Sequence, residues 1–124
     1  MSATRAPVIA VRRAYEARRP GEGPRYLVDA LWPRGLTKAA LGLAGWARDA
    51  APSKALRQWF GHDPARFAPF RRRYLAELRG HPEATEALVA ALRQGPITLV
   101  YGARDETHNN AVVLREYLRE RMHA

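Results

Sequence analysis

Pro96-Ile97-Thr98-Leu99-Val100-Tyr101-Gly102 is the stretch that decides the fold. It is a short apolar run with β-branched residues, bounded by Pro and Gly. A continuous apolar run is typical of a strand that is buried on both faces of a parallel sheet. Residues 8–11 have the same character, and residues 26–32, closed by a proline, predict a third strand.

Helix signals fill the interval between the strand predicted at residues 26–32 and the strand predicted at residues 97–101. Ser53 is a candidate N-cap for a helix that ends at Gly61. The pair Asp63-Pro64 is typical of a second helix start, and Pro82 of a third. Thr107 or a neighbour can cap a last helix after the third strand.

The order of elements therefore runs from two strands through several helices to a third strand and a last helix. A long helical connection between two strands favours a right-handed parallel crossover. We expect an α/β fold, a small three-layer domain with a short, mostly parallel sheet flanked by helices. The 124 residues suit one domain, which would span residues 1–124.

Composition excludes several classes of protein. The chain has no cysteine, which rules out disulfides, a cysteine nucleophile and cysteine metal ligands. No window has the length of a membrane span, and residues 1–10 lack the apolar stretch of a signal peptide. We expect a cytoplasmic protein that makes no contact with a membrane.

The charge is strongly basic and unevenly distributed. Residues 1–80 carry 16 cations and 6 anions, a net of +10, whereas residues 81–124 carry 5 cations and 6 anions. Such asymmetry favours an anionic ligand or partner for the first two thirds of the chain. Part of the arginine excess also has a simpler explanation, since Ala, Arg, Gly and Pro, all with GC-rich codons, make up nearly half of the residues.

Two polar segments leave the carboxyl ends of predicted strands, where ligands collect in open α/β sheets. The first holds Asp29, Trp32 and Arg34. The arginine can bind a carboxylate or phosphate through a bidentate fork, and the tryptophan can stack on a planar ligand. Alternatively, Trp32 closes the core and Arg34 pairs with a carboxylate of the protein.

The second segment holds Arg104, Asp105, His108 and Asn109 at a helix entrance. Asp105 is three residues before His108, close enough to orient the imidazole as a general acid or base. In the simpler alternative Asp105 or Thr107 caps the helix, Asn109 satisfies backbone groups and His108 is only exposed. His62, in a turn between helices, is a further candidate ligand-binding residue.

Common catalytic and nucleotide-binding motifs are absent from the sequence. There is no phosphate-binding P-loop, no GxGxxG and no GxSxG elbow. No pair of histidines has the spacing of a HExxH zinc site, so the sequence predicts no metal site and identifies no cofactor. If the protein is an enzyme, it works by acid–base or electrostatic means.

Three motifs stand out along the chain: Leu31-Trp32-Pro33-Arg34-Gly35, Trp59-Phe60-Gly61-His62-Asp63-Pro64, and Leu99-Val100-Tyr101 followed by Asp105 and His108-Asn109. With these motifs the chain resembles, over residues 8–118, the YeaO-like proteins of domain-of-unknown-function family 488. The resemblance identifies a family and implies no activity, because that family has no established biochemical function. Relatives usually have Arg where this chain has Ala30, commonly have His at Asn110, and in distant branches have Cys at Tyr101 and Asn109.

Three functions follow from these observations. The first is a small enzyme or ligand-binding domain whose pocket, at the carboxyl ends of the strands, holds an anionic small molecule between Arg34 and the helix entrance at residues 104–109. In this function His108, oriented by Asp105, is the general acid or base. The second is a nucleic-acid-binding module that uses the basic surface of residues 1–80, although no recognition motif supports it. The third is a structural or regulatory partner, for which a homodimer is one form.

Overall fold

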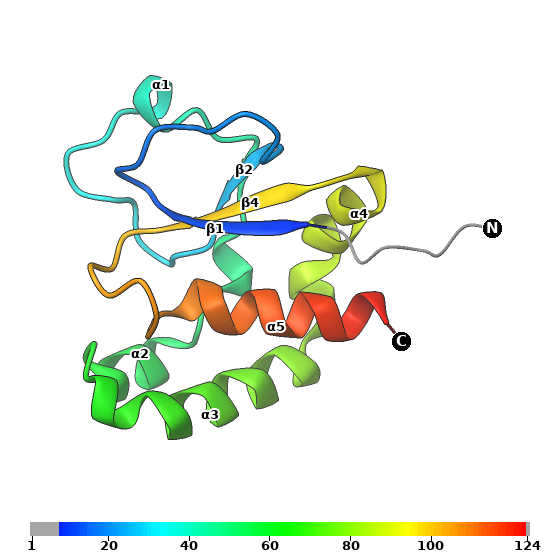
Figure 1. Ribbon diagram of the computed structural model, residues 1–124. Helices are drawn as coiled ribbons and strands as arrows, with labels where there is room; N and C mark the ends of the chain where they lie inside the picture. The colour runs from blue at the N-terminus through cyan, green and yellow to red at the C-terminus, as the bar shows by residue number, and fades with distance from the viewer. Residues whose placement is uncertain (1–7, 124) are drawn as a thin grey trace.

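Four parallel strands form one sheet in the order β1-β4-β2-β3 (Figure 1). The computed structural model describes residues 8–123, so most of the segment examined for a signal peptide lies outside the described residues. β4 (Ile97–Tyr101) pairs with β1 (Ile9–Arg13) on one side and with β2 (Arg25–Leu27) on the other. β3 (Gly45–Trp46) pairs with β2 at the edge. Every residue of β4 is buried, as its apolar sequence predicts.

Five helices accompany the sheet. They are α1 (Lys38–Leu41), α2 (Lys54–Phe60), α3 (Phe67–Gly80), α4 (Glu86–Gln94) and α5 (Asn110–Met122). Short 3₁₀ turns join several of them: η1 (Arg48–Ala50), η2 (Pro64–Arg66) and η3 (Pro82–Thr85). No helix in the described part of the chain has both the length and the apolar character needed to span a membrane.

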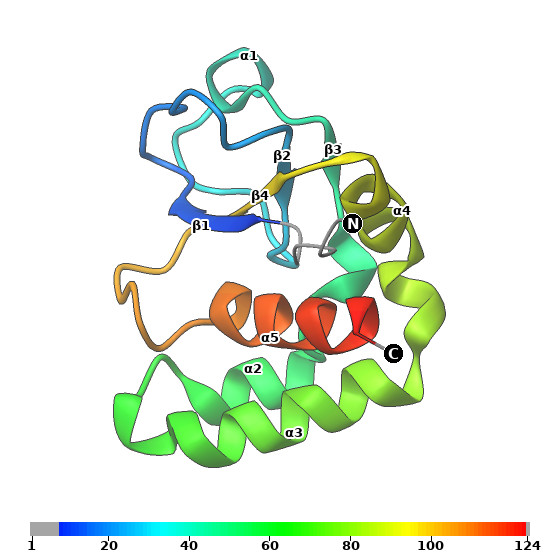
Figure 2. The same ribbon diagram turned by 45° about the vertical axis from the view of Figure 1, so that its right-hand side comes forward.

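The longer helices are layered on one side of the sheet. In both views α5 lies between the sheet and the pair α2 and α3, while α1 and its loops lie on the other side (Figures 1 and 2). The expected α/β fold is thus confirmed, with an asymmetric distribution of helices. The hydrophobic core joins the sheet to the helices. It includes buried residues of β4, α3 and α5, among them Leu99, Phe70, Tyr74, Leu114 and Leu118.

Most helix boundaries agree with the capping signals. Ser53 caps α2, and Gly61 ends it in the left-handed conformation with φ 53°. Asp63 and Pro64 begin η2, which leads into α3. Pro82 likewise begins a 3₁₀ turn, η3, that precedes α4. The last helix is capped by Asn109, two residues after Thr107, and neither Thr107 nor Asp105 is its N-cap.

The second strand differs most from its prediction. The apolar pattern predicted a strand over residues 26–32, but β2 ends at Leu27. Beyond Leu27, the hydrogen bonding to β4 continues only through the Val28 backbone N–H, which donates to the Val100 carbonyl at 3.1 Å. Trp32 instead packs edge-on against Trp46, 5.5 Å between ring centroids. The apolar residues after Leu27 thus belong to a loop and not to the strand. The sheet is completed by β3, whose two residues are too few to predict as a strand.

Candidate functional site

A pocket of about 300 Å³ opens at the carboxyl ends of β2 and β4. Asp29 reaches it from the end of β2, Ala103 from the end of β4, and Asn110 from the start of α5. Arg57 and Phe60 of α2 also line it. This volume is at the lower end of the range for small-molecule sites. The two polar segments that the sequence indicated do meet in space, and α2 adds a third group of side chains.

Asp29 joins the segments through hydrogen bonds. Its Oδ2 accepts from the Gly102 backbone N–H at 2.8 Å, and its Oδ1 accepts from Asn110 Nδ2 at 3.0 Å. The indole N–H of Trp46 donates to the Asp29 backbone carbonyl at 2.7 Å. These contacts come from β3, the loop after β4 and the start of α5. They hold the carboxyl group in one place, as a binding site requires.

Burial raises the pKa of Asp29 above its ordinary value. The hydrogen bonds from Gly102 and Asn110 oppose that effect, and so do the nearby charges of His62 and Arg57. A carboxyl group that is desolvated and faces specific polar and charged partners in a pocket is a common feature of functional sites. Asp29 is therefore the chemically most distinctive group in this pocket.

Two basic side chains contribute to the pocket from α2 and the turn that follows it. Arg57 Nε donates to the Pro52 carbonyl at 3.2 Å, which fixes the guanidinium stem. His62 is exposed and has φ 57°, the only positive φ of a residue other than glycine in residues 8–123. Backbone strain of this kind concentrates at functional sites. Both residues can offer donors to an anionic group.

Aromatic rings give the pocket an apolar wall. Phe60 and Phe70 both line it, and their rings are stacked with centroids 4.2 Å apart. Both side chains are buried, whereas Leu31, another lining residue, is 71% exposed. The wall is thus rigid, and an apolar side chain stands at the rim. Such a mixture of apolar surface and few polar groups is usual for small-molecule sites.

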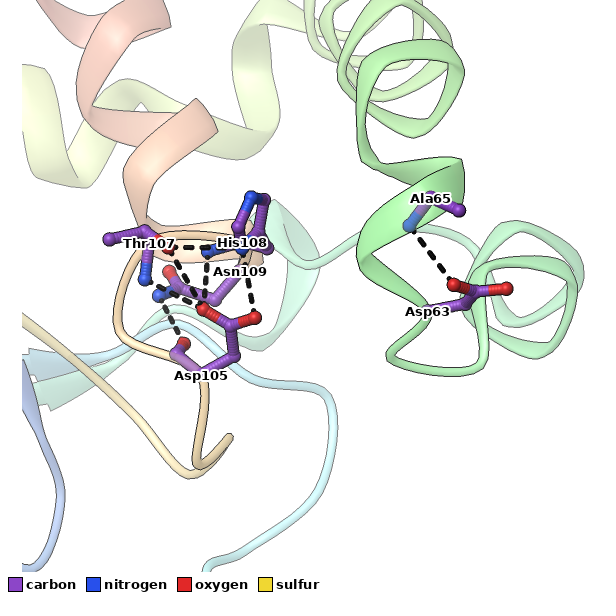
Figure 3. A network of polar contacts seen from close by, with 6 residues as sticks. All are labelled: Asp63, Ala65, Asp105, Thr107, His108 and Asn109. Carbon is purple, nitrogen blue, oxygen red and sulfur yellow. Dashed lines mark hydrogen bonds and ion pairs between the residues drawn. The ribbon is translucent and has the colours of Figure 1, made fainter.

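Asp105 and His108 form the predicted contact beside this pocket (Figure 3). Asp105 Oδ2 lies 2.9 Å from His108 Nδ1, and Asp105 Oδ1 accepts from the backbone N–H groups of Thr107 and His108, both at 2.9 Å. These bonds lower the pKa of Asp105 to about 2. The His108 ring meets Phe67 edge-on at 5.2 Å. Neither Asp105 nor His108 is a lining residue of the pocket.

Asn109 lines the pocket, but its amide is engaged by the protein. Its Oδ1 accepts from the Val112 N–H at 3.0 Å as the N-cap of α5, and its Nδ2 donates to the Asp105 carbonyl at 3.0 Å. The residue is only 1% exposed. These are the backbone contacts that the simpler reading anticipated. Figure 3 also shows the equivalent cap at Asp63, which accepts from the Ala65 N–H at 3.0 Å.

The remaining predicted residues lie outside the pocket lining. Arg34 and Arg104 are exposed, and the Arg34 carbonyl accepts from the Tyr15 hydroxyl at 2.9 Å. Trp32 donates to the Leu36 carbonyl at 2.6 Å and packs on Trp46, so its contacts are structural, but it does not belong to the hydrophobic core that was the alternative for it. Of the six predicted ligand-binding residues, the pocket brings together Asp29, His62 and Asn109.

Sequence reasoning missed three polar lining residues, Arg57, Gln58 and Asn110. A signal for Arg57 was present, since it precedes Phe60 by three residues and side chains at this spacing share a helix face. Asn110 follows the helix cap, where an amide is usually assigned to capping alone. Among residues 8–123, no group of three or more His, Asp or Glu side chains is arranged to hold a metal ion.

Comparisons with known proteins agree with the motifs. A family model described as "Inactive DUF488-N3 subclade" matches residues 8–124. The chain is 40% identical over 111 residues to the uncharacterized protein YeaO of Escherichia coli K12, covering 90% of this chain and 96% of that protein. It is 39% identical over 114 residues to the uncharacterized protein Rv3073c of Mycobacterium tuberculosis H37Rv, covering 91% and 95%.

The uncharacterized protein Mb3100c of Mycobacterium bovis matches to the same extent, 39% over 114 residues. No solved structure matches the chain significantly. The family model covers nearly all of the sequence, and the relatives are covered almost from end to end. The chain therefore belongs to the YeaO-like proteins of the DUF488 family, in the subclade whose description calls it inactive.

Proposed function

We propose that this protein is a cytoplasmic small-molecule-binding domain whose pocket at the ends of β2 and β4 holds a ligand with an anionic group. The observation that carries the proposal is the convergence of Asp29, Arg57, His62 and Asn110 from different elements on one pocket with an apolar wall. Arg57 and His62 supply the donors for the anionic group. The excess of cations in residues 1–80 adds long-range attraction for such a ligand.

Binding is a better proposal than catalysis for two reasons. The predicted acid–base pair of His108 and Asp105 does not line the pocket, and a general base must come within about 3 Å of the proton that it removes. The description of the subclade as inactive points in the same direction. A catalytic role for His108 oriented by Asp105 stays a prediction. Under our proposal, His108→Ala leaves ligand affinity unchanged.

The test is isothermal titration calorimetry with acetate, 3-phenylpropanoate and inorganic phosphate as probes. We expect 3-phenylpropanoate to bind best, since it offers a carboxylate and a ring for the wall of Phe60 and Phe70. Arg57→Gln should weaken its binding by about tenfold, which is the effect of losing one charge-assisted hydrogen bond.

Arg34→Gln and Arg104→Gln are the matched controls, because both remove an exposed arginine that does not line the pocket. We expect each control to bind the probe as the unmodified protein does. Weakening by either control with no effect of Arg57→Gln would place the anion site outside this pocket. No binding of any probe would refute the proposal.

A specific observation keeps nucleic-acid binding as a second candidate. The guanidinium groups of Arg66 and Arg73 lie over the Trp59 ring, 5.4 Å and 4.2 Å from its centroid, and Arg72 is exposed on the same helix. Clustered arginines beside an aromatic ring suit a nucleic-acid backbone and its bases. The neighbouring Arg71 and Arg79 are paired with Glu116 and Glu120, which reduces the positive field. We therefore rank this function second.

A further inference from the structure

The orientation of the Asn110 amide leaves an acceptor in the pocket. Its Nδ2 donates both to the Val28 carbonyl and to Asp29 Oδ1, each at 3.0 Å. Both partners are acceptors, so the nitrogen must face them and the oxygen must face away. Asn110 Oδ1 has no hydrogen-bond partner in the described part of the chain, and it is not a buried atom. The amide oxygen is thus available to a ligand.

Asp29 adds further acceptor capacity at the same place. An ionised carboxylate offers about four lone-pair sites, and the Gly102 N–H and Asn110 Nδ2 occupy two of them. Asp29 and Asn110 are joined by a hydrogen bond, so their remaining acceptors are adjacent. A ligand that met this pair with a second acceptor or an anion would be repelled. A group rich in N–H donors, such as an ammonium, would be bound.

Donors enter the pocket from a different part of the structure. Arg57 Nε donates to Pro52, and no hydrogen bond of its two Nη groups to another described residue is present. His62 lies five residues further along, in the turn after α2. The acceptors thus come from the ends of β2 and the start of α5, whereas the cationic donors come from α2 and its turn. The pocket has two sets of polar groups with opposite preferences.

From this arrangement we infer that the pocket takes a small zwitterion of the α-amino-acid class, with its ammonium against Asp29 and Asn110 Oδ1 and its carboxylate against Arg57 and His62. The inference rests on the proposed function and names the class of ligand. The stacked rings of Phe60 and Phe70, with Leu31 at the rim, favour an apolar amino-acid side chain.

The test compares three probes of the same shape by calorimetry. They are phenylalanine, 3-phenylpropanoate, which lacks the ammonium, and phenethylamine, which lacks the carboxylate. Leucine serves as a second amino acid with a smaller side chain. We expect phenylalanine or leucine to bind at least about tenfold more tightly than either single-charge probe, since each adds a charge-assisted contact that those probes lack.

Variants of the two sets of residues should have opposite effects. Asn110→Ala and Asp29→Asn should each lower phenylalanine affinity to the level of 3-phenylpropanoate, and leave the affinity for 3-phenylpropanoate equal or higher. Arg57→Gln should lower the affinity for both probes that carry a carboxylate, phenylalanine and 3-phenylpropanoate. It should leave the affinity for phenethylamine unchanged. Arg93→Gln, on the exposed surface of α4, is the matched control and should change nothing.

The outcomes separate the inference from the proposed function. Binding of 3-phenylpropanoate as tight as that of phenylalanine and leucine overturns the inference and leaves the anion pocket intact. Failure of every probe to bind overturns both. Because the probe comparison uses the unmodified protein, it decides the matter even if Asp29→Asn does not fold.

Discussion

The backbone of His62 adopts an unfavourable, left-handed conformation. Its φ of 57° directly follows Gly61, which has φ 53°, so two successive residues are left-handed. A residue with a Cβ in this conformation costs roughly 1–2 kcal/mol. Asp63 then caps the next helical segment. The sharp turn places His62 at the lining of the pocket, where the residue is exposed to solvent.

His62→Gly should therefore stabilise the fold and weaken binding. Relief of the left-handed conformation outweighs the added flexibility of glycine in the unfolded chain by roughly 0.5–1 kcal/mol. Urea unfolding measures that gain, and titration with 3-phenylpropanoate should show weaker binding. His123→Gly, at the end of α5, is a control for loss of an exposed histidine. Loss of stability in His62→Gly would show that the ring contributes packing that the backbone cost conceals.

Asp29 should make the preference for amino acids depend on pH. Its pKa is raised, so protonation begins at a higher pH than for an exposed aspartate. A protonated Asp29 no longer attracts an ammonium and no longer repels a carboxylate. The affinity ratio of phenylalanine to 3-phenylpropanoate should fall as the pH is lowered from neutrality, and it should do so at a higher pH than an exposed aspartate would require.

The ratio is the informative quantity because both probes carry the same carboxylate, so a change at the anion-binding end of the pocket alters both affinities alike. Calorimetry at several pH values gives the comparison, with Asp29→Asn as the variant whose ratio should be constant. A ratio that rises toward low pH in the unmodified protein would contradict the assigned position of the ammonium.

At the scale of elements, the start of α5 holds the site together. Asn109 caps the helix, Asn110 fixes Asp29, and Asp105 orients the loop before them. The sequence predicted a polar helix entrance here and the structure confirms that placement. The sequence alone could not assign Asn109 to the helix cap and Asn110 to the hydrogen bond with Asp29, because the two adjacent amides have the same chemistry. Their roles depend on which one faces Val28 and Asp29 across the sheet edge.

Asn109→Ala should destabilise the protein by about 1–2 kcal/mol, the usual cost of removing a helix N-cap. The loss also leaves the Asp105 carbonyl without its Nδ2 donor. Chemical denaturation provides the measurement, and Asn109→Ser, which retains a capping oxygen, should recover most of the difference. Folded Asn109→Ala protein should still bind the probes, since this amide is already engaged. A selective loss of binding without loss of stability would assign Asn109 to the ligand instead.

At the scale of the whole molecule, the basic charge is only partly available to a polyanion. Several arginines are paired with carboxylates, among them Arg12 with Glu22 and Arg121 with Glu86. Others contact aromatic rings, such as Arg48 over Trp46 at 3.9 Å. The net charge of +9 already subtracts the paired carboxylates, so the ion pairs determine where the remaining cations lie and do not reduce the net charge. Because the cations are spread over many elements and the sequence has no recognition motif, we expect weak binding of nucleic acid.

A labelled single-stranded oligonucleotide should bind weakly at low salt and dissociate as salt rises, because each phosphate contact contributes roughly one power of salt concentration. Fluorescence anisotropy between about 20 and 200 mM salt measures the slope. Replacing both Arg72 and Arg73 by Gln should reduce it by about two, whereas Arg93→Gln should not. Tight binding that persists at high salt would promote nucleic-acid binding to the leading function.

The sequence by itself determined the α/β class, the buried strand Ile97–Tyr101, most helix starts and the edge of the sheet where polar residues gather. Those features depend on local chemistry, namely apolar runs, caps and prolines. Only the tertiary structure decided that Arg57 and Asn110 enter the pocket and that Arg34 and Arg104 do not. Their placement depends on how α2 packs against α3, how α5 packs against α3 and the sheet, and where β2 ends. Such choices arise from contacts between residues far apart in the chain, and a local pattern does not encode them.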